Sequence, residues 1–262
     1  MFVDAPRDGD KALLLFPNGE DRIITLKAGK VTQTKYGAIR HDDMLTKSWG
    51  GIIETSTGFR VFFQKPTYSE IVYSLFSRKS QVIYEKDVAL MLMHSGIGKG
   101  SIVGESGVGS GFLTAHILSA IGSKDSYWGY EIRKDMAETA VRNLNLLGYD
   151  IRDRIIIKDI REGVEERGFQ AFFLDLPEPW EAMESIYDSL AASARVVAFV
   201  PSTNQIIKTL NYNSVKKKYY IYRVFETMVR EYEKDGEAFR PSFFQKVFSG
   251  YVMVFLKKSQ GD

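Results

Sequence analysis

The sequence contains no cysteine among its 262 residues. Disulfide bonds, thiolate metal sites and cysteine nucleophiles are therefore excluded, and a reducing cytoplasm is the expected location. No apolar run approaches the roughly 20 residues needed to cross a bilayer. From the first ten residues, MFVDAPRDGD, we expect no signal peptide. We therefore expect a cytoplasmic protein with no membrane contact and no metal centre.

The sequence also lacks a strong excess of either charge. It carries 35 Lys and Arg against 33 Asp and Glu, a net charge of +2, with 44% hydrophobic residues. This balance is typical of a globular protein with a substantial core. Any contact with nucleic acid must then come from a local basic patch.

Residues 1–66 are rich in β-strand signals. KALLLF and DRIITL flank the turn-forming PNGE, and IIETSTGFRVFF has the pattern of a second hairpin. No helical period is visible before Pro66. We therefore predict a small all-β domain over residues 1–66.

From residue 67 onward, helix and strand patterns alternate. This alternation predicts a parallel sheet covered by helices on both faces, an α/β domain over residues 67–262. The expected helices cover residues 67–76, 87–94, 111–122, 133–148, 180–191 and 202–213. The expected strands cover residues 101–105, 126–131, 154–159, 169–175 and 195–200, with 218–227 and 247–258 as a final antiparallel pair.

A glycine-rich loop, VGESGVGSG, follows one of these strands and opens a helix. Gly107, Gly109 and Gly111 occupy alternate positions, so the loop can turn tightly and let a ligand lie against bare backbone. The next strand ends in Glu131, 20 residues after Gly111. An acid there can accept hydrogen bonds from ribose hydroxyls, so loop and acid together predict a nucleoside-cofactor site. The alternative is a plain turn followed by a solvated glutamate.

The spacing of the loop bears on which cofactor is bound. The dinucleotide pattern is G-x-G-x-x-G, whereas this loop reads G-x-G-x-G with Glu105 before it. A carboxylate disfavours a pyrophosphate and favours S-adenosylmethionine, which carries ammonium and sulfonium charges. Asp159, at the end of RIIIKD, can hydrogen-bond an adenine amino group or serve only as a turn residue.

Four segments together resemble the tRNA adenine-58 N1-methyltransferases in their archaeal and bacterial single-chain form. They are QVIYEKD, ESGVGSGFLT, GYEIRKDMAETAVRNL and LDLPEPW. The chain departs from that family at Glu85, where proline is usual, and at Phe248, where histidine is usual. The resemblance implies a Rossmann-like S-adenosylmethionine-dependent methyltransferase domain behind the small N-terminal β domain.

The resemblance also implies the activity and the site. The methyl group would pass to N1 of an adenosine in the T-loop of tRNA, at position 58 or at both 57 and 58. Cofactor contacts would come from Gln81, Tyr84, Val108 and Ser110 besides the residues already named, and Tyr84, Trp180 and Arg240 would contact the substrate. Gln81 can instead cap local backbone, and Tyr84 can instead be a core residue. A homotetramer is the implied assembly.

Asp175, at the end of FQAFFLD, is the implied catalytic residue, and it is also expected to contact the cofactor. A carboxylate that accepts a hydrogen bond from the exocyclic amino group of adenine stabilises the positive charge that develops on the ring. Pro177 and Pro179 restrict the backbone that follows, and Trp180 offers a stacking face or a pocket wall. The alternative is that Asp175 caps the following helix. Glu178 either binds a cation or faces water.

Two alternatives to this function remain open. One is a methyltransferase on the same scaffold that acts on protein carboxylates or a small molecule. The other is a non-catalytic RNA-binding subunit. The KKKYYIYR run at 216–223 offers lysines for phosphates and tyrosines for bases, or is simply a solvated face, and the N-terminal β domain is a second candidate RNA platform.

Overall fold

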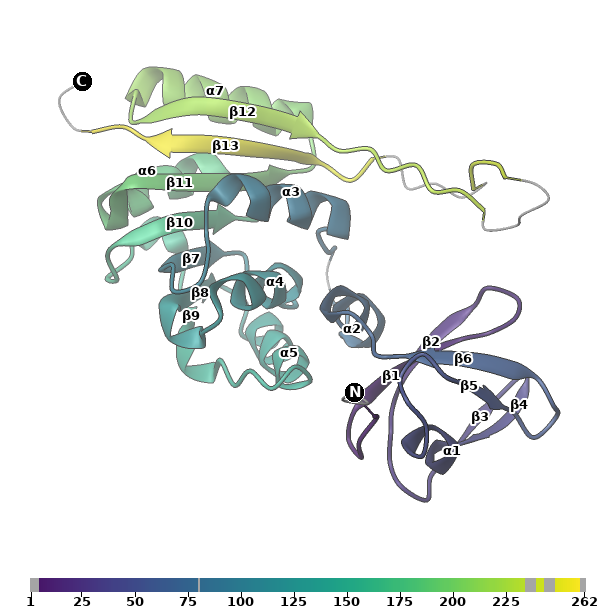
Figure 1. Cartoon of the computed structure of the whole chain (residues 1–262). Coiled ribbons are helices and arrows are strands. Elements are labelled where there is room, and N and C mark those ends of the chain that lie inside the picture. The colour runs from purple at the N-terminus through teal and green to yellow at the C-terminus, as the bar shows by residue number, and fades with distance from the viewer. Residues whose placement is uncertain (1–4, 80, 234–238, 243–247, 260–262) are drawn as a thin grey trace. The chain divides into compact units, whose positions relative to one another are not determined.

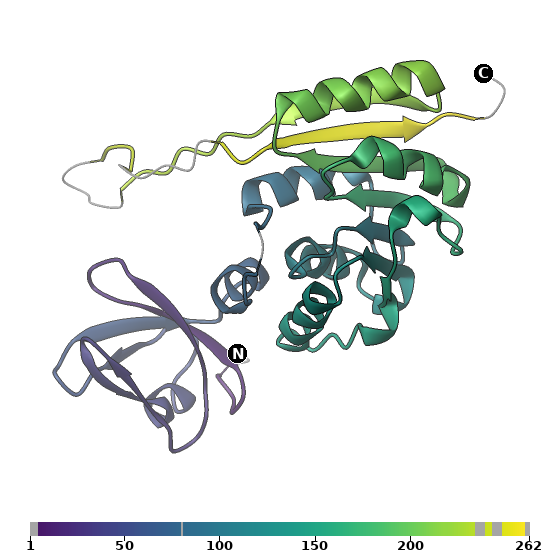
Figure 2. The same ribbon diagram turned by 180° about the vertical axis from the view of Figure 1, so that it is seen from behind.

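The computed structural model describes residues 5–79, 81–233, 239–242 and 248–259. The chain divides into two compact units, Met1–Phe76 and Ser77–Asp262 (Figures 1 and 2). Helix α2 (Tyr68–Leu75) therefore belongs to the first unit. The domain boundary expected after residue 66 stays a prediction.

The first unit is built on a four-stranded antiparallel sheet in the order β2-β1-β6-β5, with a separate β3-β4 ribbon. Both expected hairpins are present, because β1 pairs with β2 and β5 with β6. Alternate residues of these strands meet in one apolar core that includes Leu14, Ile24 and Phe63. The strands are β1 (Lys11–Leu15), β2 (Asp21–Thr25), β3 (Val31–Thr34), β4 (Gly37–Arg40), β5 (Ile52–Glu54) and β6 (Arg60–Gln64).

The expectation of no helix before Pro66 is wrong. Helix α1 (His41–Leu45) spans only five residues, too few to display a 3.6-residue period in the sequence. It is held by His41, which is buried and whose Nδ1 accepts a hydrogen bond from the Lys27 backbone N–H at 3.0 Å. The Nε2 atom then carries the proton and donates to Thr32 Oγ1 at 2.7 Å.

The second unit contains a seven-stranded sheet in the order β12-β13-β11-β10-β7-β8-β9. The strands from β11 to β9 are parallel, whereas β13 runs antiparallel to both β11 and β12. The expected final antiparallel pair is thus confirmed (Figure 1), although Val247 lies outside the described residues. The strands are β7 (Val103–Ser106), β8 (Tyr127–Glu131), β9 (Ile155–Ile157), β10 (Phe169–Leu174), β11 (Leu190–Val200), β12 (Tyr219–Glu226) and β13 (Tyr251–Lys257).

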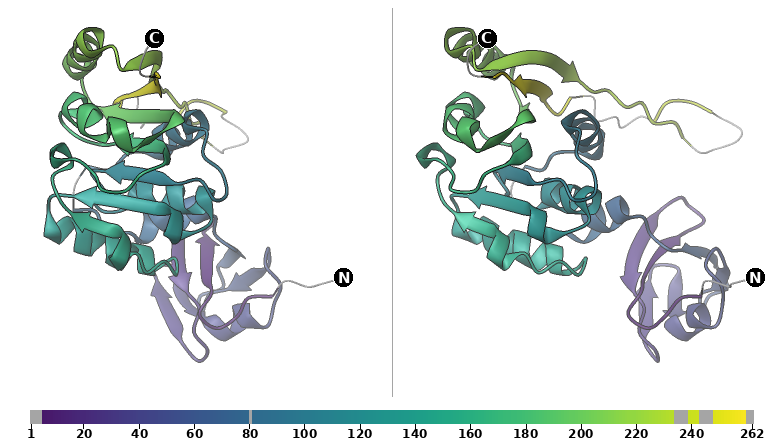
Figure 3. Two further views of the ribbon diagram at one scale, coloured as in Figure 1. Left: turned by 90° about the vertical axis from the view of Figure 1, so that its left-hand side faces the viewer. Right: turned by 60° about the vertical axis from the view of Figure 1, so that its left-hand side comes forward.

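Helices cover both faces of this sheet. In the edge-on view of Figure 3, α3 lies on one face while α6 and α7 lie on the other. The expected helix over 180–191 ends early, because Leu190 already pairs with Phe169 as the start of β11. The helices are α3 (Glu85–Ser95), α4 (Phe112–Ile121), α5 (Lys134–Asn145), α6 (Pro179–Ile186) and α7 (Thr203–Lys216).

The strand order reverses between β7 and β10. From β7 the chain moves to one edge of the sheet through β8 and β9, and it then returns to place β10 on the other side of β7. In open parallel sheets a ligand crevice forms outside the carboxyl ends of the strands at such a reversal. The glycine loop after β7, Glu131 at the end of β8 and Asp175 after β10 all lie at this point.

Candidate active site

The glycine loop and Asp175 are packed directly against each other. Gly107 has φ +87°, and a Cβ atom there would lie 2.1 Å from the carbonyl oxygen of Asp175. The Asp175 N–H donates to the Ser106 carbonyl at 2.9 Å, and the Gly107 N–H donates to the Tyr130 carbonyl at 3.0 Å. No other residue type fits at position 107, because any side chain would push Asp175 out of place.

Glu131 holds the glycine loop from the neighbouring strand. Its Oε2 accepts the Gly109 backbone N–H, and its Oε1 accepts the Arg133 backbone N–H, both at 2.9 Å. Gly111 then opens α4 with φ +82°, where a Cβ atom would lie 3.2 Å from the Ala140 Cβ. The glycines thus allow the tight turn, let the start of α4 pack closely against Ala140, and let the Asp175 backbone lie against Gly107.

Glu105 is fully buried beneath the loop. Its Oε2 accepts hydrogen bonds from Thr114 Oγ1 at 2.8 Å and from the Tyr127 hydroxyl at 2.6 Å. Its Oε1 has no hydrogen-bond partner within the described residues. Burial raises the pKa of Glu105 to about 8. An orphaned carboxyl oxygen of this kind suits a cationic ligand, which would supply both a donor and a compensating charge.

Asp175 is half-buried at the end of β10. Burial, and then the negative charge of Glu131, raise the pKa of Asp175 to about 7. The N-cap position of α6 is occupied by Glu178, so Asp175 does not cap that helix. The segment between them is fixed by Gln205, whose Nε2 donates to the Pro177 carbonyl at 2.8 Å.

A pocket of about 510 Å³ opens at this point, with both Asp175 and the glycine loop in its wall. A second pocket, of about 200 Å³, shares Gly107, Glu131, Ile132, Leu176 and Pro177 with the first, so the two form one continuous cleft. A narrow recess of about 30 Å³ beneath the loop is lined by Glu105, Val108 and Ser110 and also reaches Asp175. We call the 510 Å³ part the larger pocket and the 200 Å³ part the smaller pocket.

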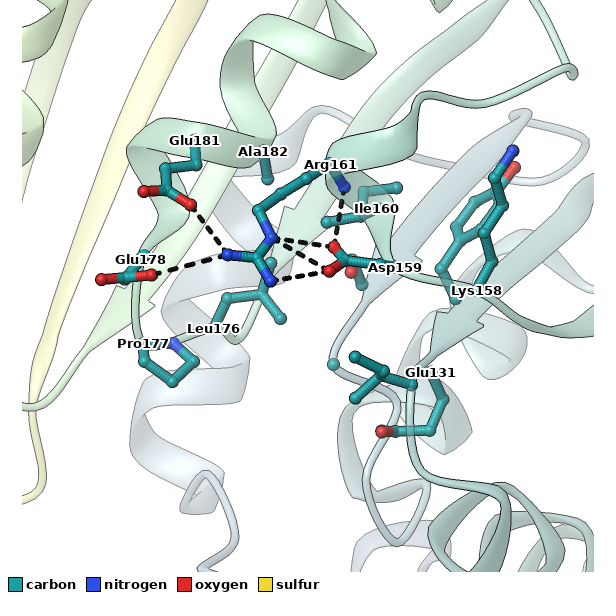
Figure 4. A pocket seen from close by; sticks show the side chains of 14 residues that line it. Glu131, Lys158, Asp159, Ile160, Arg161, Leu176, Pro177, Glu178, Glu181 and Ala182 are labelled. Atoms are coloured by element: carbon teal, nitrogen blue, oxygen red, sulfur yellow. Dashed lines mark hydrogen bonds and ion pairs between the residues drawn. The ribbon is translucent and has the colours of Figure 1, made fainter.

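Asp159 lies in the wall of the smaller pocket (Figure 4). Its carboxylate forms an ion pair with Arg161 at 2.7 Å, and this hydrogen-bonded contact lowers the pKa of Asp159. Arg161 also reaches Glu181 at 3.1 Å and Glu178 at 3.9 Å, so it bridges the strand β9 side of the pocket to α6. Asp159 additionally accepts the Arg161 backbone N–H, which is the turn role, so it both lines the pocket and closes a turn.

Of the remaining residues predicted from the sequence, only some line this cleft. Gln81 lines the larger pocket and is exposed. Tyr84 is half-buried at the N-cap of α3, and the ring of Trp180 on α6 lies 5.5 Å from Lys208 Nζ. Arg240 pairs with Glu233 at 2.8 Å. Gly111, Tyr84, Trp180 and Arg240 are absent from the described lining of the three pockets.

Sequence reasoning missed several lining residues. Ile132, with 63% of its surface exposed, contributes to both the larger and the smaller pocket. In the sequence, the only available signal for it was an apolar residue directly after a strand-terminal acid. Ser249, from the opposite end of the sequence, lines the larger pocket and offers no comparable signal. Within the described part of the chain, no group of three His, Cys, Asp or Glu could hold a metal ion, and no helix is long and apolar enough to cross a membrane.

Two sequence families match the chain. The family described as "tRNA methyltransferase complex GCD14 subunit" matches residues 61–241, and "TrmI-like N-terminal" matches residues 7–53. Among curated relatives, the tRNA (adenine(58)-N(1))-methyltransferase TrmI of Thermus thermophilus is 28% identical over 92% of this chain and 94% of its own length. The tRNA (adenine(57)-N(1)/adenine(58)-N(1))-methyltransferase TrmI of Methanocaldococcus jannaschii is 26% identical over 81% of this chain and 84% of its own length.

Solved structures give a similar result. The tRNA (m1A58) methyltransferase TrmI of Aquifex aeolicus superposes with a TM-score of 0.83 at 27% identity, over 98% of this chain and 100% of that one. A protein of Thermotoga maritima described as a SAM-dependent O-methyltransferase superposes with a TM-score of 0.86 at 28% identity, over 99% of this chain and 97% of that one.

Proposed function

The chain belongs to the family described as the GCD14 subunit of the tRNA methyltransferase complex, and on that premise we propose that it methylates N1 of an adenosine in the T-loop of tRNA. The methyl donor is S-adenosylmethionine, and the target is position 58. The observation that carries this proposal is the larger pocket, whose wall contains both the glycine loop and Asp175. One cavity therefore presents the residues for a cofactor together with a carboxylate for a base.

The residues of the cleft fit S-adenosylmethionine. When bound, this cofactor supplies an electrophilic methyl group on a sulfonium centre. The backbone of Gly107 and Gly109, the carboxylate of Glu131 and the orphaned oxygen of Glu105 would hold it, while Gly111 shapes the loop by its packing against Ala140. Asp159 and Ile132 would lie at the nucleoside end, because both line the smaller pocket.

Asp175 supplies what the target base needs. Adenine N1 is a weak nucleophile, and its methylation leaves a positive charge on the ring. A carboxylate that accepts a hydrogen bond from the exocyclic amino group stabilises that charge as it forms. Since N1 lies on the Watson–Crick edge, the base must leave its pairing to enter the larger pocket. The rest of the catalysis is positioning of the base by the pocket wall.

Several finer points belong to the same proposal. Methylation at position 57 in addition to 58 is a second possibility, which the name of the archaeal relative supports for that protein. Gln81 and Tyr84 would border the cofactor, and Trp180 and Arg240 would contact RNA outside the pockets. We expect a homotetramer in the cytoplasm, where tRNA is available.

A methyl-transfer assay tests the proposal. The protein is incubated with an unmodified tRNA transcript and methyl-labelled cofactor, and the RNA is then digested to nucleosides. We expect label in 1-methyladenosine, and loss of nearly all label for Asp175→Ala with cofactor binding retained. Asp188→Ala, at an exposed aspartate after α6, is the matched control and should stay near the wild-type rate.

The same digest distinguishes N1-methylation from two other outcomes on tRNA. Label in a 2′-O-methylated nucleoside would point instead to O-methyl transfer, the activity for which the Thermotoga maritima protein is named. Tight tRNA binding without any label would indicate a non-catalytic subunit. Near wild-type turnover of Asp175→Ala would overturn the assigned role of that carboxylate.

A further inference from the structure

A buried ion pair at the start of α3 has no part in the cofactor site described above. Lys86 and Asp87 are in contact at 2.9 Å between Nζ and Oδ1, with side chains only 8% and 0% exposed. Burying two charges costs several kcal/mol per ion unless the geometry and the remaining hydrogen bonds compensate for it. The partners of this pair therefore indicate what it does.

The ion pair ties α3 to both strands of the C-terminal antiparallel pair. Lys86 Nζ donates to the carbonyl of Thr227, just after β12, at 2.7 Å, and to Ser249 Oγ, just before β13. Ser249 Oγ in turn lies within hydrogen-bond distance of Asp87 Oδ2. The hydroxyl of Ser249 is thus held between a cation and an anion.

This arrangement determines the direction of every hydrogen bond. An ammonium group can only donate, and a carboxylate can only accept. The proton of the Ser249 hydroxyl must therefore point to Asp87, while one of its oxygen lone pairs accepts from Lys86. Only the second lone pair remains, and within the described residues no other group donates to it. Ser249, normally both a donor and an acceptor, is here an acceptor only.

Ser249 lines the larger pocket together with Asp175. The pocket wall therefore offers two acceptors. One is Asp175, directly after β10, and the other is Ser249, just before β13. An exocyclic amino group has two N–H bonds and can use two acceptors. A purine with an oxygen at C6 would place a third acceptor against Asp175 and Ser249. The three acceptors repel one another, and none of them is paired with a donor.

We propose that the Lys86–Asp87 ion pair is a positioning pair, and that it fixes Ser249 as a hydrogen-bond acceptor for the exocyclic amino group of the target adenosine. The inference rests on the proposed function and adds a residue that selects a 6-amino purine. Ser249 touches the substrate, whereas Lys86 and Asp87 act through Ser249.

The first test compares Ser249→Ala with wild type on two ligated tRNAs, one with adenosine and one with unsubstituted purine at the target position. Single-turnover rates are measured with enzyme in excess. We expect Ser249→Ala to slow the adenosine substrate about fivefold, the effect of one lost neutral hydrogen bond, and to leave the purine substrate unchanged. Ser249→Thr keeps the hydroxyl and should restore the preference, and Ser214→Ala on α7 should change neither rate.

Equal slowing of both substrates by Ser249→Ala, or no slowing of either, would overturn the inference. Failure of the proposed function has a different signature, because wild-type enzyme would then give no 1-methyladenosine from the adenosine substrate at all.

The second test concerns the ion pair. Replacing both partners, as Lys86→Met with Asp87→Leu, removes the charges together and avoids leaving one of them buried and unpaired. The Ser249 hydroxyl is then free to rotate and to donate. Two competitor tRNAs are compared, one with inosine and one with unsubstituted purine at the target position. We expect the affinity for the inosine tRNA, divided by the affinity for the purine tRNA, to be about fivefold higher in the double variant than in wild type. An unchanged ratio would mean that the Lys86–Asp87 pair has only a structural role, and it would overturn the proposal that the pair positions Ser249.

Discussion

Binding of a cationic cofactor should release protons, because two carboxyl groups of the cleft are partly protonated without it. The pKa of Glu105 is raised to about 8 and that of Asp175 to about 7. At pH 7 about nine-tenths of Glu105 and about half of Asp175 then carry a proton. A positive charge in the cleft lowers both pKa values, so binding at pH 7 releases up to about 1.4 protons.

Isothermal titration calorimetry measures this release. S-adenosylmethionine is titrated into the protein in buffers of different ionisation enthalpy, and the slope of the observed enthalpy gives the number of protons. Affinity should rise from pH 6 to pH 8 and level off above about pH 9, because the carboxylates are then ionised before binding. Asp175→Asn should lower the release at pH 7 by about 0.5 proton, and Glu105→Gln by about 0.9.

The result that would refute this reasoning is binding of the cofactor with no proton release in wild type and no change of affinity between pH 6 and pH 8. Release that persisted undiminished in both variants would assign the protons to other groups. Asp188→Asn, at an exposed site, serves as the control and should release as many protons as wild type.

Three further predictions follow from particular contacts. Gly107→Ala should weaken cofactor binding at least tenfold by equilibrium dialysis, because the new Cβ would lie 2.1 Å from the Asp175 carbonyl oxygen, whereas Gly98→Ala, with open space around it, should not. Burial lowers the pKa of His41, so the first unit should lose up to about 1.4 kcal/mol of stability per pH unit as the pH falls below the ordinary value of about 6.5; urea unfolding at pH 7 and pH 5.5 should show this loss, and His41→Asn should abolish it. Lys86→Met alone should destabilise the protein by about 3–5 kcal/mol in urea unfolding, since it leaves the Asp87 carboxylate buried and unpaired, while the double replacement with Asp87→Leu should cost far less.

The sequence predicted those parts of the site that lie at strand ends. Gly107 and Asp175 each directly follow a strand and Glu131 ends one, and parallel strands bring their carboxyl ends to one edge of a sheet. Local pattern is therefore enough to place them together. Helix α1 was missed because five residues cannot display a helical period. The hydrogen bond between Ser249 and Asp87 joins positions 162 residues apart, and no periodicity encodes such a contact.

Residue identity was easier to predict than ionisation. Glu105 was expected from its position before the loop to be a fixed negative charge near the cofactor. The structure places it under the loop, fully buried, and burial raises its pKa to about 8. Its charge at neutral pH therefore depends on what occupies the cleft, a property that follows from depth in the fold and has no signature in the local sequence.

Carboxyl groups with raised pKa values explain how one cleft can bind the cationic S-adenosylmethionine tightly and still release the uncharged-sulfur product, S-adenosylhomocysteine. Asp175 lines both the larger pocket, with Glu131, and the recess beneath the loop, with Glu105. Burial and the repulsion between these negative charges make a bound cation favourable. Anionic cofactors such as dinucleotides meet the same acids unfavourably. S-adenosylhomocysteine carries no sulfonium charge, so with this product bound the pKa values of Glu105 and Asp175 would be lowered less than with the methyl donor. The product S-adenosylhomocysteine should therefore release fewer protons on binding than S-adenosylmethionine does, and its affinity should depend less steeply on pH between 6 and 8.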